Sequence, residues 1–202
     1  FITEIWVTNK KLGYKVQKKI LNNNNIKIKL LDLSYPQPHP KKVIYRIAYL
    51  GTSSHTLELK WLKPLFEKIQ SERNDCLIEI YVDKKWRKFF RDIPRLKMIH
   101  PTDWETFYID TLKRKVDIVV NPIISSKFNS FRSPTKFFDI TRLGAVGLYS
   151  NLEPFNKFIN NNHDGILLKN NIEDWSKEIF YLLDNKKERK RLFSNALKKI
   201  SQ

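Results

Sequence analysis

Residues 116–150, VDIVVNPIISSKFNSFRSPTKFFDITRLGAVGLYS, carry the patterns of a strand, a loop, a helix and a second strand in succession. The apolar run Val116–Val120 predicts a buried strand, and Ala145–Ser150 predicts the next one. Between them, Ser133–Leu143 is predicted to be a helix, because a serine followed by a proline is a favourable helix start. This order indicates a parallel β-α-β unit.

The rest of the main region repeats the same alternation. Further strands are predicted at residues 43–50, 76–82, 96–99 and 165–168, and further helices at residues 54–71, 103–114, 154–160, 174–183 and 187–201. Strands that alternate with helices indicate an α/β fold with a doubly wound, Rossmann-like parallel sheet. Such sheets bind ligands beyond the carboxyl ends of their strands, so we expect a site in the loops that follow the strands.

The N-terminal region is predicted to be separate. Its pattern comprises strands at residues 5–8 and 26–33, a helix at residues 10–21, and a stretch with three prolines at residues 34–40. A segment so rich in proline is typical of a linker. We therefore place a domain boundary there, with residues 1–40 as a separate part of the chain and residues 41–202 as the main domain. Because the chain opens at Phe1, we expect it to be a piece of a longer protein.

The composition excludes several classes of protein. With 41% hydrophobic and 13% aromatic residues, the chain can bury a core, which excludes disorder as its main state. A single cysteine, Cys76, excludes a disulfide scaffold and a cysteine-based zinc site, and it favours a reducing compartment. Apolar runs are too short to span a membrane, so we expect a cytoplasmic protein, either soluble or peripheral on the inner face of the cytoplasmic membrane.

The charge is strongly positive. Lys and Arg number 38 against 21 Asp and Glu, which gives a net charge of +17. Such an excess suits a polyanionic partner, and a basic nucleic-acid-binding module is therefore one alternative. The excess is spread along the whole chain, although residues 1–46 hold 10 basic and only 2 acidic side chains. With no recognisable nucleic-acid motif, we expect no nucleic-acid partner. The excess also fits the background composition that an AT-rich genome produces, and its share in residues 1–46 suits an anionic membrane surface.

Charged side chains gather at the start of the helix predicted at residues 133–143. Ser133 is expected to cap this helix and Pro134 to occupy its first position. The free N–H groups there favour anions, and Arg132 and Lys136 add two positive charges, which suits a phosphate or diphosphate. Asp139 lies on the same face as Lys136 and suits the hydroxyls of a ribose. The alternative is a solvated face with an ion pair between Lys136 and Asp139.

The run Phe128–Gly144, FNSFRSPTKFFDITRLG, followed by a strand, resembles the C-terminal nucleotide-sugar domain of retaining glycosyltransferases of the GT-B fold. It is similar to the "group 1" (family 4-like) bacterial enzymes that make surface polysaccharides such as capsule and lipopolysaccharide. The similarity extends to IAYLGTSSH at residues 47–55, VDIVVNP at residues 116–122 and HDGILL at residues 163–168. Together these pieces cover about residues 43–200 and are more specific than any one of them alone.

The resemblance implies a nucleoside diphosphate sugar, with UDP or GDP, as the donor. Arg132 and Lys136 would be the catalytic residues, because they would neutralise the departing diphosphate. The residues implied to bind the donor are Gly51, Thr52, Ser53, His55, His100, Asn129, Ser133, Pro134, Thr135 and Asp139. The family normally uses no metal ion, so neither a metal nor another cofactor is expected.

One position departs from the family pattern. Many members have a glutamate where this chain has Phe131. The identity of the donor sugar therefore stays open, and a non-catalytic interaction domain with the same fold is a second alternative. The resemblance also implies a saccharide or lipid-linked acceptor, and an N-terminal, acceptor-binding domain of the same protein as a partner. Residues 1–40 would be the last β-α-β part of that domain with the proline-rich linker. We expect residues 1–202 to bind the nucleotide without transferring sugar on their own.

Overall fold

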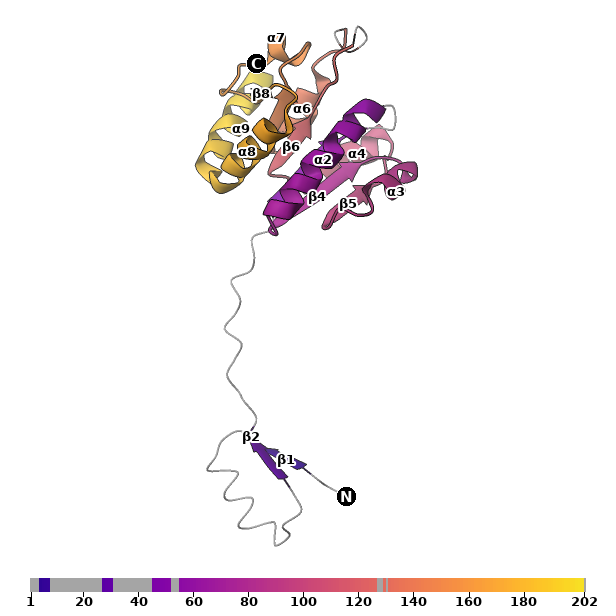
Figure 1. Cartoon of the computed structure of the whole chain (residues 1–202). Coiled ribbons are helices and arrows are strands. Elements are labelled where there is room, and N and C mark those ends of the chain that lie inside the picture. Colours follow the sequence, from indigo (N-terminus) through magenta and orange to yellow (C-terminus); the bar gives the residue numbers. More distant parts are fainter. Residues whose placement is uncertain are drawn as a thin grey trace. The chain divides into compact units, whose positions relative to one another are not determined.

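The computed structural model of the chain describes residues 4–7, 27–30, 45–51, 55–126, 129 and 131–201. The chain divides into two compact units, Phe1–Lys42 and Val43–Gln202. In the first unit, β1 (Glu4–Val7) and β2 (Lys27–Leu30) pair in parallel (Figure 1). The helix and the proline-rich linker predicted within the first 40 residues lie outside the described residues. The assignment of this unit to another domain stays a prediction.

The second unit is built on six parallel strands in the order β5-β4-β3-β6-β7-β8. The strands are β3 (Tyr45–Leu50), β4 (Cys76–Tyr81), β5 (Leu96–Ile99), β6 (Ile118–Asn121), β7 (Val146–Ser150) and β8 (Ile166–Leu168). The strand order changes direction between β3 and β6, which is the switch point of a doubly wound sheet. The predicted Rossmann-like α/β fold is confirmed.

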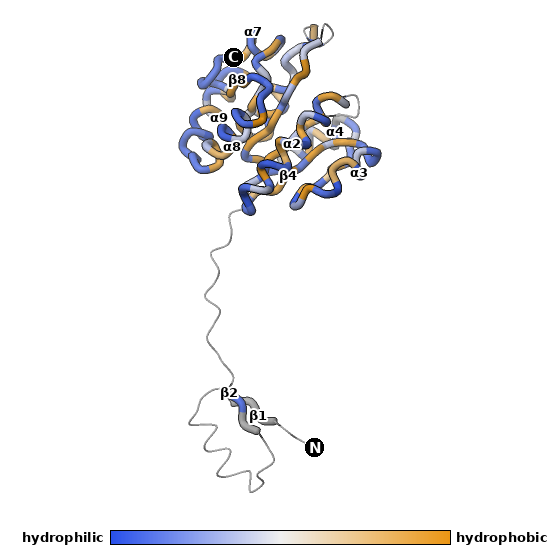
Figure 2. The backbone as a smooth tube through the Cα atoms, in the orientation of Figure 1, coloured by the Kyte–Doolittle hydropathy of each residue, from blue (hydrophilic) through white to orange (hydrophobic). Residues whose placement is uncertain are grey.

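Helices cover both faces of this sheet. They are α2 (Thr56–Glu72), α3 (Arg87–Phe90), α4 (Trp104–Lys113), α6 (Thr135–Arg142), α7 (Phe155–Phe158), α8 (Ile172–Asp184) and α9 (Lys186–Ile200), with a 3₁₀ turn η1 at Lys84–Trp86. Hydrophobic residues concentrate along the strands, whereas the outer helix α9 is largely hydrophilic (Figure 2). This distribution is expected for parallel strands that are buried on both faces.

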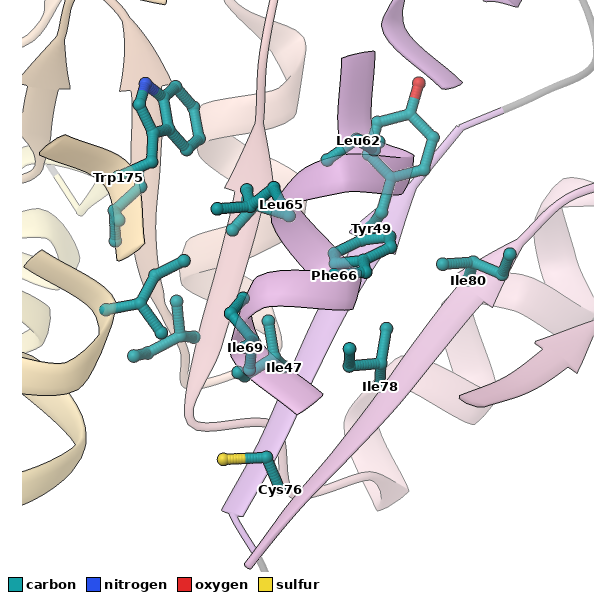
Figure 3. Packing of buried hydrophobic residues seen from close by; sticks show 14 of the residues in the cluster. Ile47, Tyr49, Leu62, Leu65, Phe66, Ile69, Cys76, Ile78, Ile80 and Trp175 are labelled. Atoms are coloured by element: carbon teal, nitrogen blue, oxygen red, sulfur yellow. The ribbon is translucent and has the colours of Figure 1, made fainter. Parts of the chain in front are cut away.

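Successive residues of β3 pack in two separate parts of the core. Ile47 and Tyr49 pack with buried residues of α2 and α8, while Ala48 and Leu50 pack with Phe137 of α6. Figure 3 shows Ile47 beside Ile69 of α2 within the first of these clusters. Each fully buried aliphatic or aromatic side chain contributes about 1.5–3 kcal/mol to the free energy of folding. The packing on the two faces of the sheet therefore fixes the positions of the helices.

One short helical region of the structure was not predicted from the sequence. Residues 84–90 form η1 and the one-turn helix α3, which the sequence pattern did not indicate. The turn is held by packing, because Phe90 is buried and its ring lies 6.4 Å from that of Phe66. Among the described residues, no helix is both long enough and apolar enough to cross a membrane.

Candidate functional site

Helix α6 begins at the carboxyl edge of the sheet, after the loop that follows β6. Its N-cap is Pro134, with φ −78° and ψ 32°, and the helix itself starts at Thr135. The prediction that Ser133 caps the helix is therefore wrong. The proline ring fixes φ but leaves ψ free, and Pro134 stays outside the helix. The first N–H groups of α6 still end at this edge, where they carry partial positive charge.

Arg132 and His55 come from different loops and meet beside the start of α6. Nη2 of Arg132 lies 3.3 Å from Nε2 of His55, and Nη1 of Arg132 lies 3.5 Å from Nδ1 of His55. Burial lowers the pKa of His55, and the charge of Arg132 lowers it further, against the opposing effect of Glu58. A neutral imidazole has one acceptor nitrogen, so His55 can accept a hydrogen bond from the guanidinium group.

Two buried polar side chains support this pair. Glu58 is 6% exposed. Its Oε1 accepts a hydrogen bond from Nδ2 of Asn129 over 3.4 Å, and its Oε2 lies 3.9 Å from Nδ1 of His55. Asn129 is 8% exposed, donates to the Ile124 carbonyl over 2.7 Å, and accepts from Nη1 of Arg132 over 3.4 Å. Asn129 thus positions Arg132. The direct contact with the nucleotide sugar that the resemblance implies for Asn129 stays a prediction.

Lys136 and Asp139 form the ion pair that the sequence allowed. Nζ of Lys136 lies 3.5 Å from Oδ2 of Asp139, while Nη2 of Arg142 donates to Oδ1 over 2.7 Å. The pair is not a freely solvated face, because the Lys136 and Asp139 side chains are only 28% and 19% exposed. Burial lowers the pKa of Lys136, and the carboxylate of Asp139 opposes that shift. An anion bound beside Lys136 would favour its charged form.

Two adjoining pockets lie at this edge, and both include Leu50 and Lys136 in their walls. The smaller has a volume of about 30 Å³ and is lined also by Tyr49, His55, Asn121, Pro122, Ile123, Arg132, Ser133, Thr135, Pro154 and Phe155. The larger has a volume of about 230 Å³ and is lined also by Gly51, Tyr81, Pro101, Thr102, Phe107 and Asp139. Lys136 therefore stands between a compact, positively charged pocket and a roomier one with aromatic walls.

The loop behind the smaller pocket is held by Ser150, the last residue of β7. Its hydroxyl group accepts a hydrogen bond from the Ile123 N–H over 2.8 Å and donates to Oδ1 of Asn170 over 2.5 Å. Nδ2 of Asn170 in turn donates to the Ile123 carbonyl over 2.8 Å. These bonds fix the backbone that follows β6. Within the described part of the chain, no group of three or more His, Cys, Asp and Glu side chains is placed to hold a metal ion.

Solved glycosyltransferase structures share this fold. The C-terminal domain of LpcC, a group 1 glycosyl transferase of Francisella tularensis, matches with a TM-score of 0.57 and 12% identity over 77% of this chain and 85% of that chain. A mutant of S. aureus TarM, in complex with fondaparinux, α-GlcNAc-glycerol and UDP, matches with a TM-score of 0.59 and 14% identity. WaaG, a glycosyltransferase involved in lipopolysaccharide biosynthesis, matches with a TM-score of 0.58 and 11% identity.

The chain has the fold of a GT-B C-terminal domain. This confirms the fold that the resemblance implied. The matches cover 96% of this chain but 40% of TarM, and 95% of this chain but 56% of WaaG, so the chain spans about half the length of these enzymes or less. The amino-acid sequence itself matches no known family model and no curated protein.

The carboxyl edge of the sheet brings together most of the predicted site residues that the structure describes. Those in the pocket walls are Gly51, His55, Arg132, Ser133, Thr135, Lys136 and Asp139. His100 is exposed and is not a lining residue; its Nδ1 lies 2.7 Å from the carbonyl of Pro101, which does line the larger pocket. Thr52 and Ser53 lie outside the described residues. Phe131 is 81% exposed and lines neither pocket.

Several lining residues were missed from the sequence. Asn121 and Tyr81 are the last residues of β6 and β4, and Tyr49 lies one residue before the end of β3. The signal was available, because a polar or aromatic residue at the carboxyl end of a strand in this fold faces the ligand edge. Glu58 lies one helical turn after His55 and so shares its face, a spacing that can be read from the sequence.

Proposed function

We propose that the chain binds the nucleoside diphosphate sugar of a glycosyltransferase. The observation that carries this proposal is the position of Lys136, half-buried on the first turn of α6 and shared by two pockets, on a fold found in glycosyltransferases. A cation at a helix start suits the diphosphate. In this proposal the nucleoside occupies the larger pocket, and the smaller pocket holds the phosphate that carries the sugar.

The larger pocket offers chemistry for a nucleoside. The rings of Tyr81 and Phe107 in its wall lie 5.7 Å apart in an edge-to-face arrangement, which provides apolar surface for a base. Asp139 is proposed to accept hydrogen bonds from the ribose hydroxyls, as acidic residues do in other doubly wound nucleotide sites. Its second contact, with Arg142, holds the carboxylate in place.

The cations of the smaller pocket are proposed to act in the chemical step. When the bond between the sugar and the diphosphate breaks, negative charge builds up on the departing phosphate oxygens. Arg132, Lys136 and the first N–H groups of α6 would stabilise this charge, and they need little rearrangement because His55, Asn129 and the helix hold them in place. Stabilisation of the transition state more than of the bound donor is what would accelerate the transfer.

The finer parts of the proposal rest on the sequence resemblance. They are transfer with retention of configuration, no requirement for a metal ion, and an acceptor that is a saccharide or lipid-linked intermediate of capsule or lipopolysaccharide synthesis. The acceptor is proposed to bind another domain of the same protein, at the inner face of the cytoplasmic membrane. The larger pocket is smaller than the roughly 300–1,000 Å³ of complete ligand pockets, which supports a site that a second domain completes.

Calorimetric titration of the 202-residue chain with UDP, GDP, ADP and CMP tests the proposal. We expect at least one nucleoside diphosphate to bind, and to bind more tightly than its nucleoside titrated in the same way. No binding of any of the four at millimolar concentration would contradict the proposal. Tight, salt-sensitive binding of DNA without any nucleotide binding would instead favour the nucleic-acid alternative.

A further inference from the structure

Asn121 is the last residue of β6 and is buried at the site, with 7% of its surface exposed. The residue lines the smaller pocket, together with Arg132 and Lys136. Its Nδ2 atom donates no hydrogen bond to any residue in the described part of the chain. A buried amide N–H₂ group without an acceptor is uncommon in folded proteins and calls for a specific explanation.

The position of Asn121 is fixed by the sheet. It pairs in parallel register with Tyr149 of β7, which is itself buried. Residues of one strand alternate between faces, so Asn121 shares the face of Val119, which packs in one cluster with Phe137 of α6. Asn121 therefore lies on a strand, beneath the start of α6. A strand holds a binding group more precisely than a loop does.

The surroundings define what the amide would bind. Arg132 and Lys136 bring positive charge to the same pocket, and the first N–H groups of α6 end there. Every one of these groups donates and none accepts. A ligand atom that satisfies them together has to be an acceptor and is best an anion, because positive groups at a helix start otherwise oppose the helix dipole.

We propose that Asn121 is a substrate-contacting residue whose Nδ2 donates a hydrogen bond to an anionic phosphate oxygen held at the start of α6. This inference rests on the proposed function, because it takes the anion to be the diphosphate of the donor. Asn121 then contacts the phosphate and not the nucleoside. Its missing protein partner is explained by a bond that forms only when the ligand binds.

The test replaces Asn121 by leucine, which has nearly the same size but no donor. UDP, GDP, ADP, inorganic pyrophosphate and the nucleosides uridine, guanosine and adenosine are titrated into both proteins. We expect Asn121→Leu to weaken the binding of diphosphates about 10- to 100-fold, the loss expected for a hydrogen bond to a charged group, and to leave nucleoside binding unchanged. We also expect its melting temperature to be equal to or above that of the unmodified chain, because the Nδ2 atom has no acceptor to lose among the described residues.

Asn195→Leu is the matched control. Nδ2 of Asn195 donates to the His163 carbonyl over 3.0 Å, away from both pockets. This variant should keep its affinity for diphosphates and lose stability. Equal diphosphate binding by Asn121→Leu and the unmodified chain would overturn the inference alone. So would a parallel loss of nucleoside and diphosphate binding with a lower melting temperature. An unmodified chain that binds none of the probes would overturn the proposed function and the inference with it.

Discussion

Nη2 of Arg132 lies 3.3 Å from Nε2 of His55, although 77 positions separate the two residues in the chain. The contact joins the loop after β3 to the loop before α6, across the switch point of the sheet. Because β3 and β6 are neighbours in the sheet, their carboxyl ends bring these loops together. The arrangement keeps a neutral imidazole beside a permanent cation, and this has a measurable consequence for the response to pH.

We expect His55→Gln to flatten the dependence of stability on pH. The pKa of His55 is lowered in the folded chain, so between that value and its ordinary pKa of about 6.5 the unfolded chain binds more protons. The unmodified chain therefore loses stability as the pH falls below about 6.5. Urea unfolding of both proteins between about pH 7 and pH 5 measures the difference. If the two curves stay parallel throughout, His55 does not titrate differently on folding.

Lys136→Ala is expected to weaken diphosphate binding much more than nucleoside binding. The ammonium group is shared by both pockets, and a hydrogen bond to a charged group corresponds to about a 10- to 100-fold change in affinity. Calorimetry with UDP and uridine, or the matching pair for the preferred base, gives the comparison. Lys187→Ala, an exposed change on α9, is the control for the loss of one positive charge. Equal losses of affinity for the nucleoside and the diphosphate would contradict the proposal that Lys136 binds the diphosphate.

Gly51→Ala is expected to destabilise the chain by about 1–3 kcal/mol. A Cβ atom at this position would come within 2.2 Å of Cε1 of Tyr49, and the buried Tyr49 ring cannot move aside. A double-mutant cycle with Tyr49→Leu checks the cause by urea unfolding, since the cost of the added methyl group should shrink once the ring is gone. Additive effects of the two changes would show that the clash is relieved in another way.

Trp175→Ala is expected to lower the free energy of unfolding by about 3–5 kcal/mol. The Trp175 side chain is fully buried, its ring meets that of Trp61 edge-to-face with centroids 5.0 Å apart, and Nε1 donates to the Lys169 carbonyl over 2.9 Å. Denaturant unfolding measures the loss. Tyr181→Ala on the same helix removes a ring that is 51% exposed and should change stability by no more than about 0.5 kcal/mol.

The sheet could be predicted from the sequence because its strands are buried on both faces. A run such as Ile118–Val120 is apolar without interruption, and a helix of clear periodicity follows most strands. Two features escaped prediction for physical reasons. Helix α3 has a single turn, and it depends on the packing of Phe90 rather than on a local pattern. The start of α6 depends on the ψ angle of Pro134, which the proline ring does not restrict.

The site was predictable in its charged residues and less so in its neutral ones. Arg132, Lys136 and Asp139 stand out because charges at a helix start are easy to read from a sequence. The roles of Asn121 and Asn129 depend on which neighbours the folded chain brings to them. Asn129 donates a hydrogen bond to Glu58 and accepts one from Arg132, whereas Nδ2 of Asn121 has no acceptor among the described residues. Sequence alone does not distinguish these two asparagines.

The contact between Lys136 and Asp139 couples the two pockets, because Lys136 is in the walls of both. Nζ of Lys136 lies 3.5 Å from Oδ2 of Asp139 and helps to satisfy that oxygen. A phosphate in the smaller pocket that drew the ammonium away would free a lone pair of Asp139 for a hydroxyl group in the larger pocket. Occupancy of one pocket would then raise the affinity of the other, and by thermodynamic reciprocity the reverse would hold equally. A nucleotide would bind with cooperativity between its own two halves.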